Sequence, residues 1–482
     1  MKYKLIFLGI GVLLMIEALF LFLSSIVSLL YKSNDLQSLL MSGFITFSVG
    51  GILYLLFRKT EQKASNREAF IIVSLCWFVL SFFGALPFVF SEMNVSLVDS
   101  FFETMSGLTT TGATVFNNIE SFPKGLLFWR SILQWLGGMG IIVLSMALIS
   151  FVKTGGLQLF NAEAPILSTE KIHPRINIMA RILWLMYLGL TVIQTILLYF
   201  GGMSIFDAVC HSLTTISSGG FSTKQNNIAA FQSGYIQYVI IIFMFIAGTN
   251  FNLIYFGITG QFRKILKNTE FKFYTLIIVL FTILIGFGLY CYMSFSIEKS
   301  FRNSLFQVVS ILTTTGFASS DYLKWTPTVL STLLLVLMFI GASTGSTSGG
   351  IKAIRVHILF RNIFVEFKRI IHPRAVLPLR YNKHSVSQQI INNIMAFIAL
   401  YLITILFGTI VMQFAGMDIM SAFGTVVASL GNIGTGTGSV GPIDTFSHIN
   451  NFGKIFLSFL MMLGRLELFT VLIIFTKTFW KK

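Results

Sequence analysis

Charged residues are scarce in this chain of 482 residues: only 11% are Asp, Glu, Lys or Arg, whereas 55% are hydrophobic. A soluble domain of this size carries roughly twice that charged fraction. Apolar runs longer than about 18 residues recur along the chain, and runs of that length are typical of membrane-spanning helices. The composition therefore excludes a soluble globular protein and predicts a polytopic membrane protein.

Cysteine and catalytic motifs are also in short supply. The three cysteines, Cys76, Cys210 and Cys291, lie in apolar segments without a CxxC pair or a zinc-ligand spacing, so we expect buried free thiols. HExxH and Ser/His/Asp patterns are absent. The longest polar loops, 152–176 and 370–385, are too short to bury the core of a catalytic or nucleotide-binding domain. These absences argue against an enzyme and against an organic cofactor.

Acidic residues are fewer than basic ones, 18 against 34, which gives a formal net charge of +16. When spans are assigned by hydropathy, 25 of the 34 basic residues fall on one side of the membrane, eight fall on the other, and Arg465 lies within a span. This asymmetry follows the positive-inside rule. It predicts a multi-pass membrane protein with both termini in the cytoplasm. The excess charge is then explained by topology and by membrane lipids rather than by nucleic acid.

Ten helices of membrane length are predicted. They cover roughly residues 5–30, 38–57, 68–90, 122–151, 177–200, 233–258, 272–295, 326–369 with an interruption, 386–415 and 449–478. The first run is too long for a removable signal peptide. Four segments of intermediate polarity lie between these helices, near 99–118, 207–224, 303–320 and 421–440.

Each of these four segments repeats one pattern, in which a helix-capping residue is followed thirteen positions later by a glycine. The pairs are Asp99 and Gly112, Asp207 and Gly220, Asn303 and Gly316, and Ser421 and Gly434. Asp, Asn and Ser are preferred N-caps. About eleven helical residues span roughly 16 Å, which is about half of the hydrocarbon thickness. The pattern predicts four short re-entrant helices, each followed by a loop that returns to the external side.

The resulting fold class is an all-α polytopic membrane protein. Four tandem repeats, each consisting of a helix, a pore helix, a filter loop and a helix, surround a pseudo-fourfold pore, and an N-terminal pair of transmembrane helices is added. Residues 202–208 and 416–422 have similar sequences, and this similarity supports the internal repeat. The predicted units are the N-terminal pair at 1–66 and pore repeats at 67–156, 157–262, 263–372 and 373–482.

The four loops carry the chemistry of an ion-selective filter. Backbone carbonyls replace the water of a cation without binding it too tightly to leave, and glycine permits the φ values that aim consecutive carbonyls at one axis. The predicted filter residues are Thr110, Thr111, Gly112, Ala113, Ser218, Gly219, Gly220, Phe221, Thr314, Thr315, Gly316, Phe317, Asn432, Ile433, Gly434 and Thr435. No Asp or Glu occurs at the filter glycines, which disfavours a divalent cation. Ordinary external turns would explain one such loop, but four matched loops argue against that alternative.

A stretch of ten small residues interrupts the eighth predicted helix at about mid-membrane depth. It consists of Gly341, Ala342, Ser343, Thr344, Gly345, Ser346, Thr347, Ser348, Gly349 and Gly350. Such residues do not sustain a helix, because each glycine costs ~1 kcal/mol. We expect a mobile gate below the filter; a static packing loop is the alternative. A phosphate-binding loop is rejected because Ile351 stands where lysine is needed.

Two arginines fall within apolar segments. Arg465 lies near the middle of the last span, where an arginine costs at least ~2.5–3.5 kcal/mol. We expect it to face the pore or the glycine-rich stretch as an electrostatic barrier or a gate latch, and a structural ion pair with another helix is the alternative. Glu467 is a poor partner within the same helix. Arg130 is predicted to snorkel to the outer interface beside Trp129. No intramembrane carboxylate stands out as a proton relay.

These motifs resemble the Trk/Ktr/HKT superfamily of K⁺ transporters over essentially the whole chain. The resemblance rests on the four filter loops, residues 128–140 (FWRSILQWLGGMG), the glycine-rich stretch 341–350 and residues 464–467 (GRLE). The helix pair at 5–57 and residues 372–376 (HPRAV) make the chain most similar to the bacterial TrkH type.

The resemblance implies K⁺ uptake, with Gly112, Gly220, Gly316 and Gly434 matching the family's filter glycines, 341–350 its loop gate and Arg465 its pore arginine. It also implies a homodimer that binds a cytosolic, nucleotide-binding regulatory subunit of the RCK type, similar to TrkA. A pore of the same fold that passes Na⁺, or that couples K⁺ to Na⁺ or H⁺, is the alternative function. A scaffold or receptor with a vestigial pore is disfavoured by the intact glycines.

Overall fold

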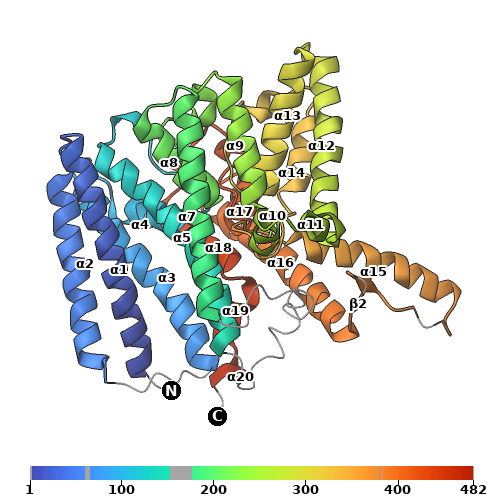
Figure 1. Ribbon diagram of the computed structural model, residues 1–482, viewed down its shortest axis with the longest axis horizontal. Helices are drawn as coiled ribbons and strands as arrows, with labels where there is room; N and C mark the ends of the chain where they lie inside the picture. Colours follow the sequence, from blue (N-terminus) through green and yellow to red (C-terminus); the bar gives the residue numbers. More distant parts are fainter. Residues whose placement is uncertain (1–2, 60–65, 152–175, 376, 383, 481–482) are drawn as a thin grey trace.

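The computed structural model describes residues 3–59, 66–151, 176–375, 377–382 and 384–480. In this part of the chain, six helices are long and apolar enough to cross a membrane, or up to eight if two bent pairs are counted as single spans. The chain is therefore a multi-pass membrane protein with an all-helical fold (Figure 1). A two-stranded hairpin, β1 (Arg380–Tyr381) and β2 (His384–Ser385), is a minor addition.

The N-terminal pair consists of α1 (Tyr3–Leu30) and α2 (Leu36–Phe57), which stand side by side at one edge of the molecule (Figure 1). The two helices come close together at a pair of glycines. A Cβ added to Gly11 would lie 2.9 Å from the carbonyl oxygen of Gly50, and the reverse distance is the same. Small residues that let two backbones approach are typical of helix packing in membranes.

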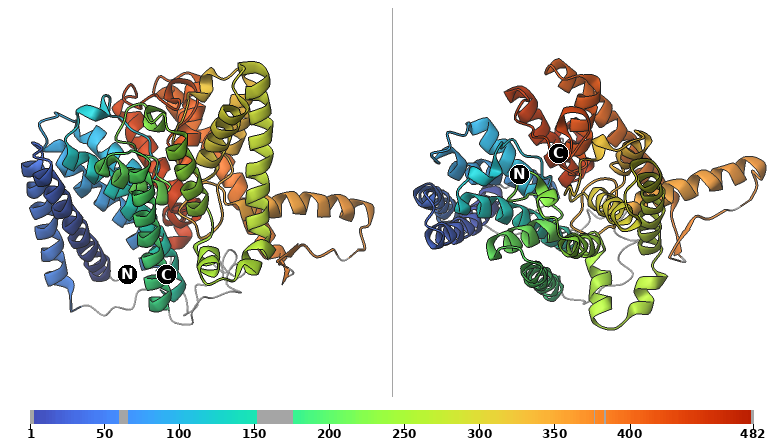
Figure 2. Two further views of the ribbon diagram at one scale, coloured as in Figure 1. Left: turned by 45° about the horizontal axis from the view of Figure 1, so that its top comes forward. Right: turned by 90° about the horizontal axis from the view of Figure 1, so that it is seen from above.

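The other long helices form four units that each contain a short helix. The first unit contains α3 (Asn66–Val89), α4 (Leu97–Leu108) and α5 (Lys124–Phe151). The second unit contains α7 (Ile176–Phe200), α8 (Ile205–Ile216), α9 (Gly234–Ala247) and α10 (Phe251–Ile258). The third unit contains α12 (Thr269–Met293), α13 (Ile297–Leu312), α14 (Val329–Leu337) and α15 (Ala353–Ile371), and the fourth contains α16 (Gln388–Phe414), α17 (Ile419–Leu430), α18 (Asn451–Arg465) and α19 (Leu468–Leu472). The chain ends with a short helical turn, Ile473–Phe475, and α20 (Lys477–Trp480), and α11 (Phe262–Lys267) connects the second and third units. Viewed from above, the four units surround a common centre (Figure 2).

The sequence locates most long helices closely. The predicted bounds of α1, α2, α3, α5, α7, α12 and α16 differ from the observed ones by no more than three residues. The predicted fold class is thus confirmed. The boundary predicted at 66/67 lies in the first turn of α3, whereas the boundary at 156/157 and nearly all of the polar loop at 152–176 lie outside the described residues.

Two predicted continuous helices are broken. The segment predicted at 233–258 bends by 109° between α9 and α10, and the segment at 449–478 bends by 115° between α18 and α19. At the first break, Asn250 caps the new helix by accepting a hydrogen bond from the backbone N–H of Asn252 (2.8 Å). At the second break, Glu467 adopts a left-handed φ of +61°. Each broken pair still passes as one span when hydropathy is averaged over 18 residues, so the average does not register the breaks.

The eighth predicted span also differs from the prediction. α14 is only nine residues long, and α15 leaves the bundle sideways rather than continuing across the membrane (Figure 1). α15 carries Arg355, Arg361, Glu366, Lys368 and Arg369, a density of charge that suits a helix outside the hydrocarbon region.

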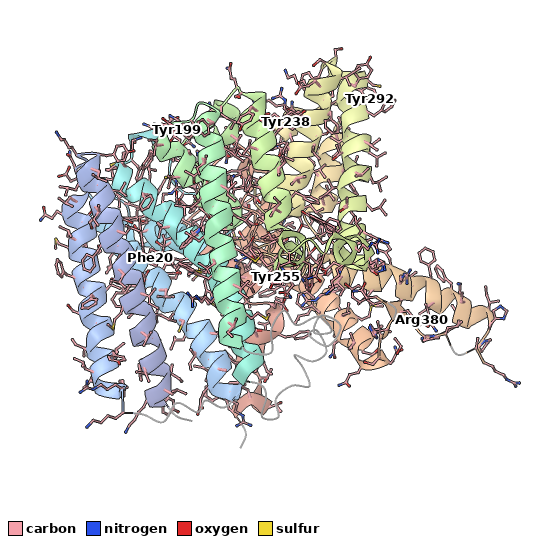
Figure 3. The ribbon with its side chains drawn as sticks, viewed as in Figure 1. Phe20, Tyr199, Tyr238, Tyr255, Tyr292 and Arg380 are labelled. Carbon is pink, nitrogen blue, oxygen red and sulfur yellow. The ribbon has the colours of Figure 1, made fainter. Side chains whose placement is uncertain are left out.

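The chain presents side chains of interfacial type at one end of the bundle. Tyr199, Tyr238 and Tyr292 lie near the upper ends of their helices, whereas Arg380 lies at the opposite, lower side (Figure 3). Tyrosines at the ends of spans are typical of the membrane–water interface. The cysteines are free, as expected, but Cys291 is exposed, because it lies on the outer surface of α12 rather than in a packed interior.

Candidate ion-conducting pore

The four short helices are capped alike, but not at the residues that the sequence pattern indicated. The caps are Ser96, Ser204, Ser296 and Asp418, and each accepts a hydrogen bond from a backbone N–H three residues later. The predicted caps Asp99, Asp207 and Ser421 instead supply that N–H, and Asn303 lies inside a longer helix of 16 residues. Both positions of a capping box carry cap-type residues, so the sequence alone does not say which one caps.

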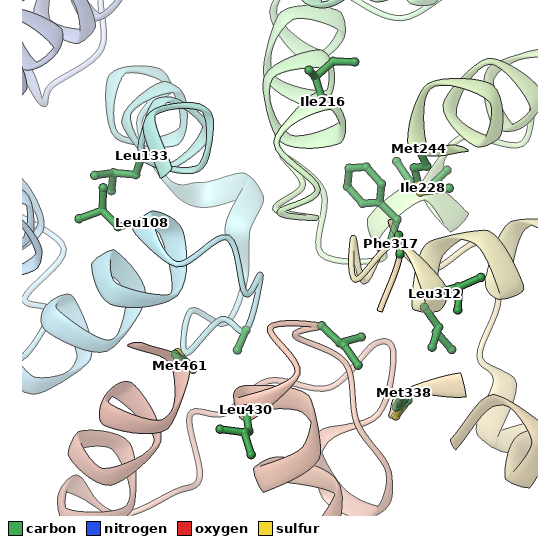
Figure 4. Close-up of a cluster of buried hydrophobic side chains, with 14 of the residues drawn as sticks. Leu108, Leu133, Ile216, Ile228, Met244, Leu312, Phe317, Met338, Leu430 and Met461 are labelled. Carbon is green, nitrogen blue, oxygen red and sulfur yellow. The ribbon is translucent and has the colours of Figure 1, made fainter. Parts of the chain in front are cut away.

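The ends of the short helices are held in one apolar layer. The last residues of these helices are Leu108, Ile216, Leu312 and Leu430. All four are buried in the main core together with Leu133 on α5, Met244 on α9, Met338 directly after α14 and Met461 on α18 (Figure 4). This layer fixes the four helix C-termini around the centre. Their negative dipole ends are oriented toward the region where the four loops meet, which favours a cation.

Beyond each short helix the backbone repeats an unusual conformation. Thr110, Ser218, Thr314 and Asn432 have φ between +50° and +56°, and Gly112, Gly220, Gly316 and Gly434, two residues later, have φ between +75° and +84°. A left-handed residue costs roughly 1–2 kcal/mol when it is not glycine, so its recurrence in all four loops is not a packing accident. Left-handed residues at every second position turn successive carbonyls to one side of the chain.

The four glycines form a closed ring. A Cβ added to Gly112 would lie 2.2 Å from the carbonyl oxygen of Gly219, and one added to Gly220 would lie 1.8 Å from that of Thr315. The ring continues from Gly316 to the oxygen of Ile433 (1.8 Å) and from Gly434 back to that of Thr111 (2.3 Å). Each loop therefore touches the next, and the carbonyl that precedes each glycine belongs to one ring around a shared axis.

The structure thus brings together all sixteen residues predicted as the filter. All of them are buried except Gly112 and Thr435, which are partly exposed. The fourth and first loops are also linked by a side chain, because the Asn432 amide donates to the Thr111 hydroxyl (3.0 Å). That amide donates in addition to the carbonyl of Met461 (2.9 Å).

The glycine-rich segment 341–350 lies directly against this ring. Its ends are joined, since the N–H of Gly341 donates to the carbonyl of Ile351 (2.7 Å). Within it, the N–H of Gly349 donates to the Thr314 hydroxyl (2.7 Å), and the Thr347 hydroxyl lies 2.8 Å from the Ser218 hydroxyl. The left-handed residues of the second and third loops are therefore hydrogen-bonded to the segment.

Arg465 is the last residue of α18, at the bend before α19, and it faces the glycine-rich segment. Its guanidinium donates to the carbonyl of Thr347 (2.6 Å) and to that of Gly137 on α5 (3.1 Å). It is 3% exposed, and within the described residues no carboxylate lies at ion-pair distance from it. Glu467 instead pairs with Arg355 (2.6 Å). Arg465 thus bridges two repeats through backbone oxygens.

Two residues that sequence reasoning missed hold the other side of the segment. The carboxylate of Glu270, on α12, accepts hydrogen bonds from the N–H (2.7 Å) and the hydroxyl (2.8 Å) of Thr344. The ammonium of Lys352 donates to the carbonyl of Ser348. Glu270 stands in the first turn of a helix, where an acidic residue is ordinary, so no local signal marks it.

Several carboxylates are buried in the part of the chain that the structure describes. Glu17, Glu103 and Glu270 are each at most 3% exposed. Glu17 lies on α1, and neither of its oxygens has a hydrogen-bond partner among the described residues. A carboxyl group in such a place is retained at lower cost in its neutral form. For Glu17, the available signal was a single acidic residue within a long apolar run.

The prediction that Arg130 snorkels to the outer interface is wrong. Arg130 is 1% exposed and contacts the chain that follows the first and second loops, at Thr114 and Ser222. Its guanidinium forms an ion pair with Glu103 on α4 (2.7 Å). Glu103 also accepts from the N–H of Val115 and the hydroxyl of Thr114, both at 2.9 Å. The ion pair therefore fixes the chain that leaves the first filter loop, and the partner on the short helix is what keeps the arginine inside.

We expect Glu103→Gln to lower the melting temperature of the solubilised protein markedly. Removing one partner leaves the Arg130 charge buried without compensation, which costs about 3–5 kcal/mol. The matched control is Glu298→Gln, which breaks the exposed Glu298–Arg302 pair (2.7 Å) and is expected to cost at most about 1 kcal/mol. Equal melting temperatures for the two variants would contradict the structural role given to the Glu103–Arg130 pair.

The chain is similar in sequence and in fold to known membrane transport proteins. The sequence profile of the TrkH family, described as cation transport proteins, matches residues 35–482. The Trk system potassium uptake protein TrkH of Escherichia coli K12 is 38% identical over 481 residues, which cover 98% of each chain. The protein of the same name from Vibrio parahaemolyticus is 37% identical over the full length of both chains. A crystal structure of the potassium transporter TrkH from Vibrio parahaemolyticus matches the fold with a TM-score of 0.91, 34% identity and complete coverage of both chains.

Proposed function

Because this chain belongs to the TrkH family of cation transport proteins, we propose that it conducts K⁺ into a bacterial cell across the inner membrane. The observation that carries the proposal is the closed ring in which each filter glycine abuts the preceding carbonyl of the next loop. A ring of main-chain oxygens replaces the hydration shell of a monovalent cation. The negative interior supplies ~2.3 kcal/mol per charge per 100 mV for entry. No catalytic step is involved.

The glycine-rich segment 341–350 is the gate in this proposal. It lies against two filter loops and is held by hydrogen bonds to Glu270 and Arg465. Such a contact set supports a barrier that opens when a few hydrogen bonds are exchanged, rather than a wall of packed side chains. Backbone without helical structure is tolerated at this depth because protein and a water-filled pore surround it.

The remaining features of the proposal concern assembly and orientation. The N-terminal end of α1 and the short helix α20 lie on the lower side in Figure 1, and the excess of basic loops supports assigning that side to the cytoplasm. The proposed units are 1–66, 67–156, 157–262, 263–372 and 373–482. A homodimer, contact with membrane lipids and a cytosolic regulatory subunit of the RCK type similar to TrkA complete the proposal; the relatives' designation as a Trk system supports a multi-component assembly.

Uptake of ⁸⁶Rb⁺ into proteoliposomes at a clamped negative potential tests the function. We expect uptake that depends on the protein and that excess K⁺ inhibits more strongly than excess Na⁺. A pore of the same fold that also passes Na⁺ is the second candidate, and the absence of threonine at the second filter position in two loops, Gly219 and Ile433, favours it. Equal inhibition by Na⁺ and K⁺ would support that candidate, and uptake no faster than in protein-free liposomes would refute both.

A further inference from the structure

The second filter loop lacks a side chain that the other loops have. The residue before the filter glycine is Thr111, Thr315 or Ile433 in three loops, but Gly219 in the second. The amide of Gln134, on α5, occupies the vacant position: a Cβ added to Gly219 would lie 2.3–2.8 Å from the amide atoms of that glutamine. A side chain from the first repeat therefore takes the place of one missing from the second.

Gln134 makes two hydrogen bonds that span the filter glycine. Its Nε2 donates to the carbonyl of Gly219 (2.7 Å), and its Oε1 accepts from the N–H of Phe221 (3.0 Å). The side chain is completely buried. Both neighbours of Gly220 are thus fixed by one amide, which positions the peptide groups on either side of that glycine.

The carbonyl of Gly219 belongs to the ring, because it is the oxygen that Gly112 abuts. None of the described residues donates a hydrogen bond to the corresponding carbonyls of Thr111, Thr315 and Ile433. The hydroxyls of Thr111 and Thr315 point back to their own helices, where each lies 2.8 Å from another threonine hydroxyl. Among the described residues, three carbonyls of the ring therefore have no hydrogen-bond donor, and the fourth accepts a hydrogen bond from the Gln134 amide.

Arg130 extends this contact along the same face of α5. It lies four residues before Gln134, donates to the carbonyl of Ser222 (3.3 Å) and stacks its guanidinium 4.2 Å from the ring centre of Phe221. Residues four apart share one helix face. The second loop is thus held from residue 219 to residue 222 by a polar stripe of the first repeat.

We propose that Gln134 is a specificity-determining positioning residue of the filter. By donating to the Gly219 carbonyl, it weakens the field of one of the four oxygens and fixes the direction in which that oxygen points. Discrimination among monovalent cations depends on the number and field strength of the coordinating carbonyls. The inference rests on the proposed function, because it concerns the ion selectivity of the same ring.

The test compares permeability ratios for K⁺, Na⁺ and Cs⁺ in proteoliposomes containing wild type, Gln134→Met or Gln134→Glu. The methionine removes both hydrogen bonds at similar length, and the glutamate keeps the acceptor for Phe221 but lacks the donor to Gly219. We expect each to shift the K⁺/Na⁺ ratio by roughly threefold to tenfold, the range that one hydrogen bond produces. The matched control, Gln194→Met, replaces a buried glutamine of α7 that has no hydrogen-bond partner among the described residues, and is expected to leave the ratio unchanged.

A complementary pair of variants keeps the test valid if single substitutions fold poorly. Gly219→Ala alone places a methyl group in the amide of Gln134 and is expected to abolish uptake, whereas Gly219→Ala combined with Gln134→Ala is expected to restore uptake with an altered ratio. Wild-type ratios in Gln134→Met and in the double variant would overturn the inference, as would full uptake by Gly219→Ala alone. Absence of uptake by wild type would refute the proposed function instead, so the two failures are distinguishable.

Discussion

Gly316→Ser is expected to abolish selective K⁺ uptake. The added Cβ would lie 1.8 Å from the carbonyl oxygen of Ile433, a separation at which one of the two loops must move. Gly316 also has a φ of +75°, a conformation that glycine adopts without a steric cost and serine resists. Displacement of that carbonyl removes one oxygen from the ring. Since ~1.4 kcal/mol of lost preference reduces selectivity tenfold, the K⁺/Na⁺ permeability ratio should fall at least about tenfold.

Gly416→Ser is the matched control for Gly316→Ser. Gly416 has a φ of +93°, and a Cβ added to it would meet no heavy atom within 4 Å. It therefore reproduces the backbone strain without the collision, and it lies just before the fourth short helix instead of after it. We expect uptake and selectivity close to wild type. If both variants lose selectivity to the same extent, strain rather than the ring contact is responsible, and the filter geometry argued above is wrong.

The four loops that we propose as the filter could be recognised in the sequence because their pattern is local. A capping residue, a short helix and a glycine at fixed spacing are all properties of about twenty consecutive residues, and four copies of them make a chance match improbable. The positions of the long helices follow from hydropathy for the same reason. The error of three residues at caps such as Ser96, where Asp99 was predicted, arose because the two residues of a capping box are chemically alike.

The supports of the filter were not predictable because they depend on contacts between distant segments. Gln134 meets Gly219 across 85 positions, and Glu270 meets Thr344 across 74. Arg130 was wrongly predicted to lie at the interface, because its partner Glu103 lies on another helix. From the sequence alone, an arginine in an apolar segment looks the same whether it is paired in the interior or directed toward water. The breaks after α9 and α18 were not predicted for a related reason. The cap formed by Asn250 and the left-handed conformation of Glu467 mark these breaks, and neither follows from composition.

Arg465→Met is expected to raise basal K⁺ flux about tenfold or more. Arg465 donates one hydrogen bond to the glycine-rich segment at Thr347 and another to Gly137 of α5, so it ties the segment to the bundle. A hydrogen bond from a charged donor is worth about 1.5–3 kcal/mol, which corresponds to a change of tenfold or more in a closed-to-open ratio. Flux of ⁸⁶Rb⁺ through proteoliposomes, normalised to folded protein measured by size-exclusion chromatography, gives the comparison.

Arg465→Lys separates the two ways in which this residue could restrict the pore. Lysine keeps the positive charge but is a compact single head group that does not bridge two carbonyls as a guanidinium does. If Arg465 acts as a latch, the lysine variant should leak nearly as much as Arg465→Met; if charge alone blocks cations, it should resemble wild type. Lys454→Met, which removes a buried cation at the opposite end of α18 where it pairs with Asp99, controls for general destabilisation. Loss of folded protein without any rise in normalised flux would mean that Arg465 serves only to join the repeats, because a latch cannot be removed without the closed state becoming less favourable.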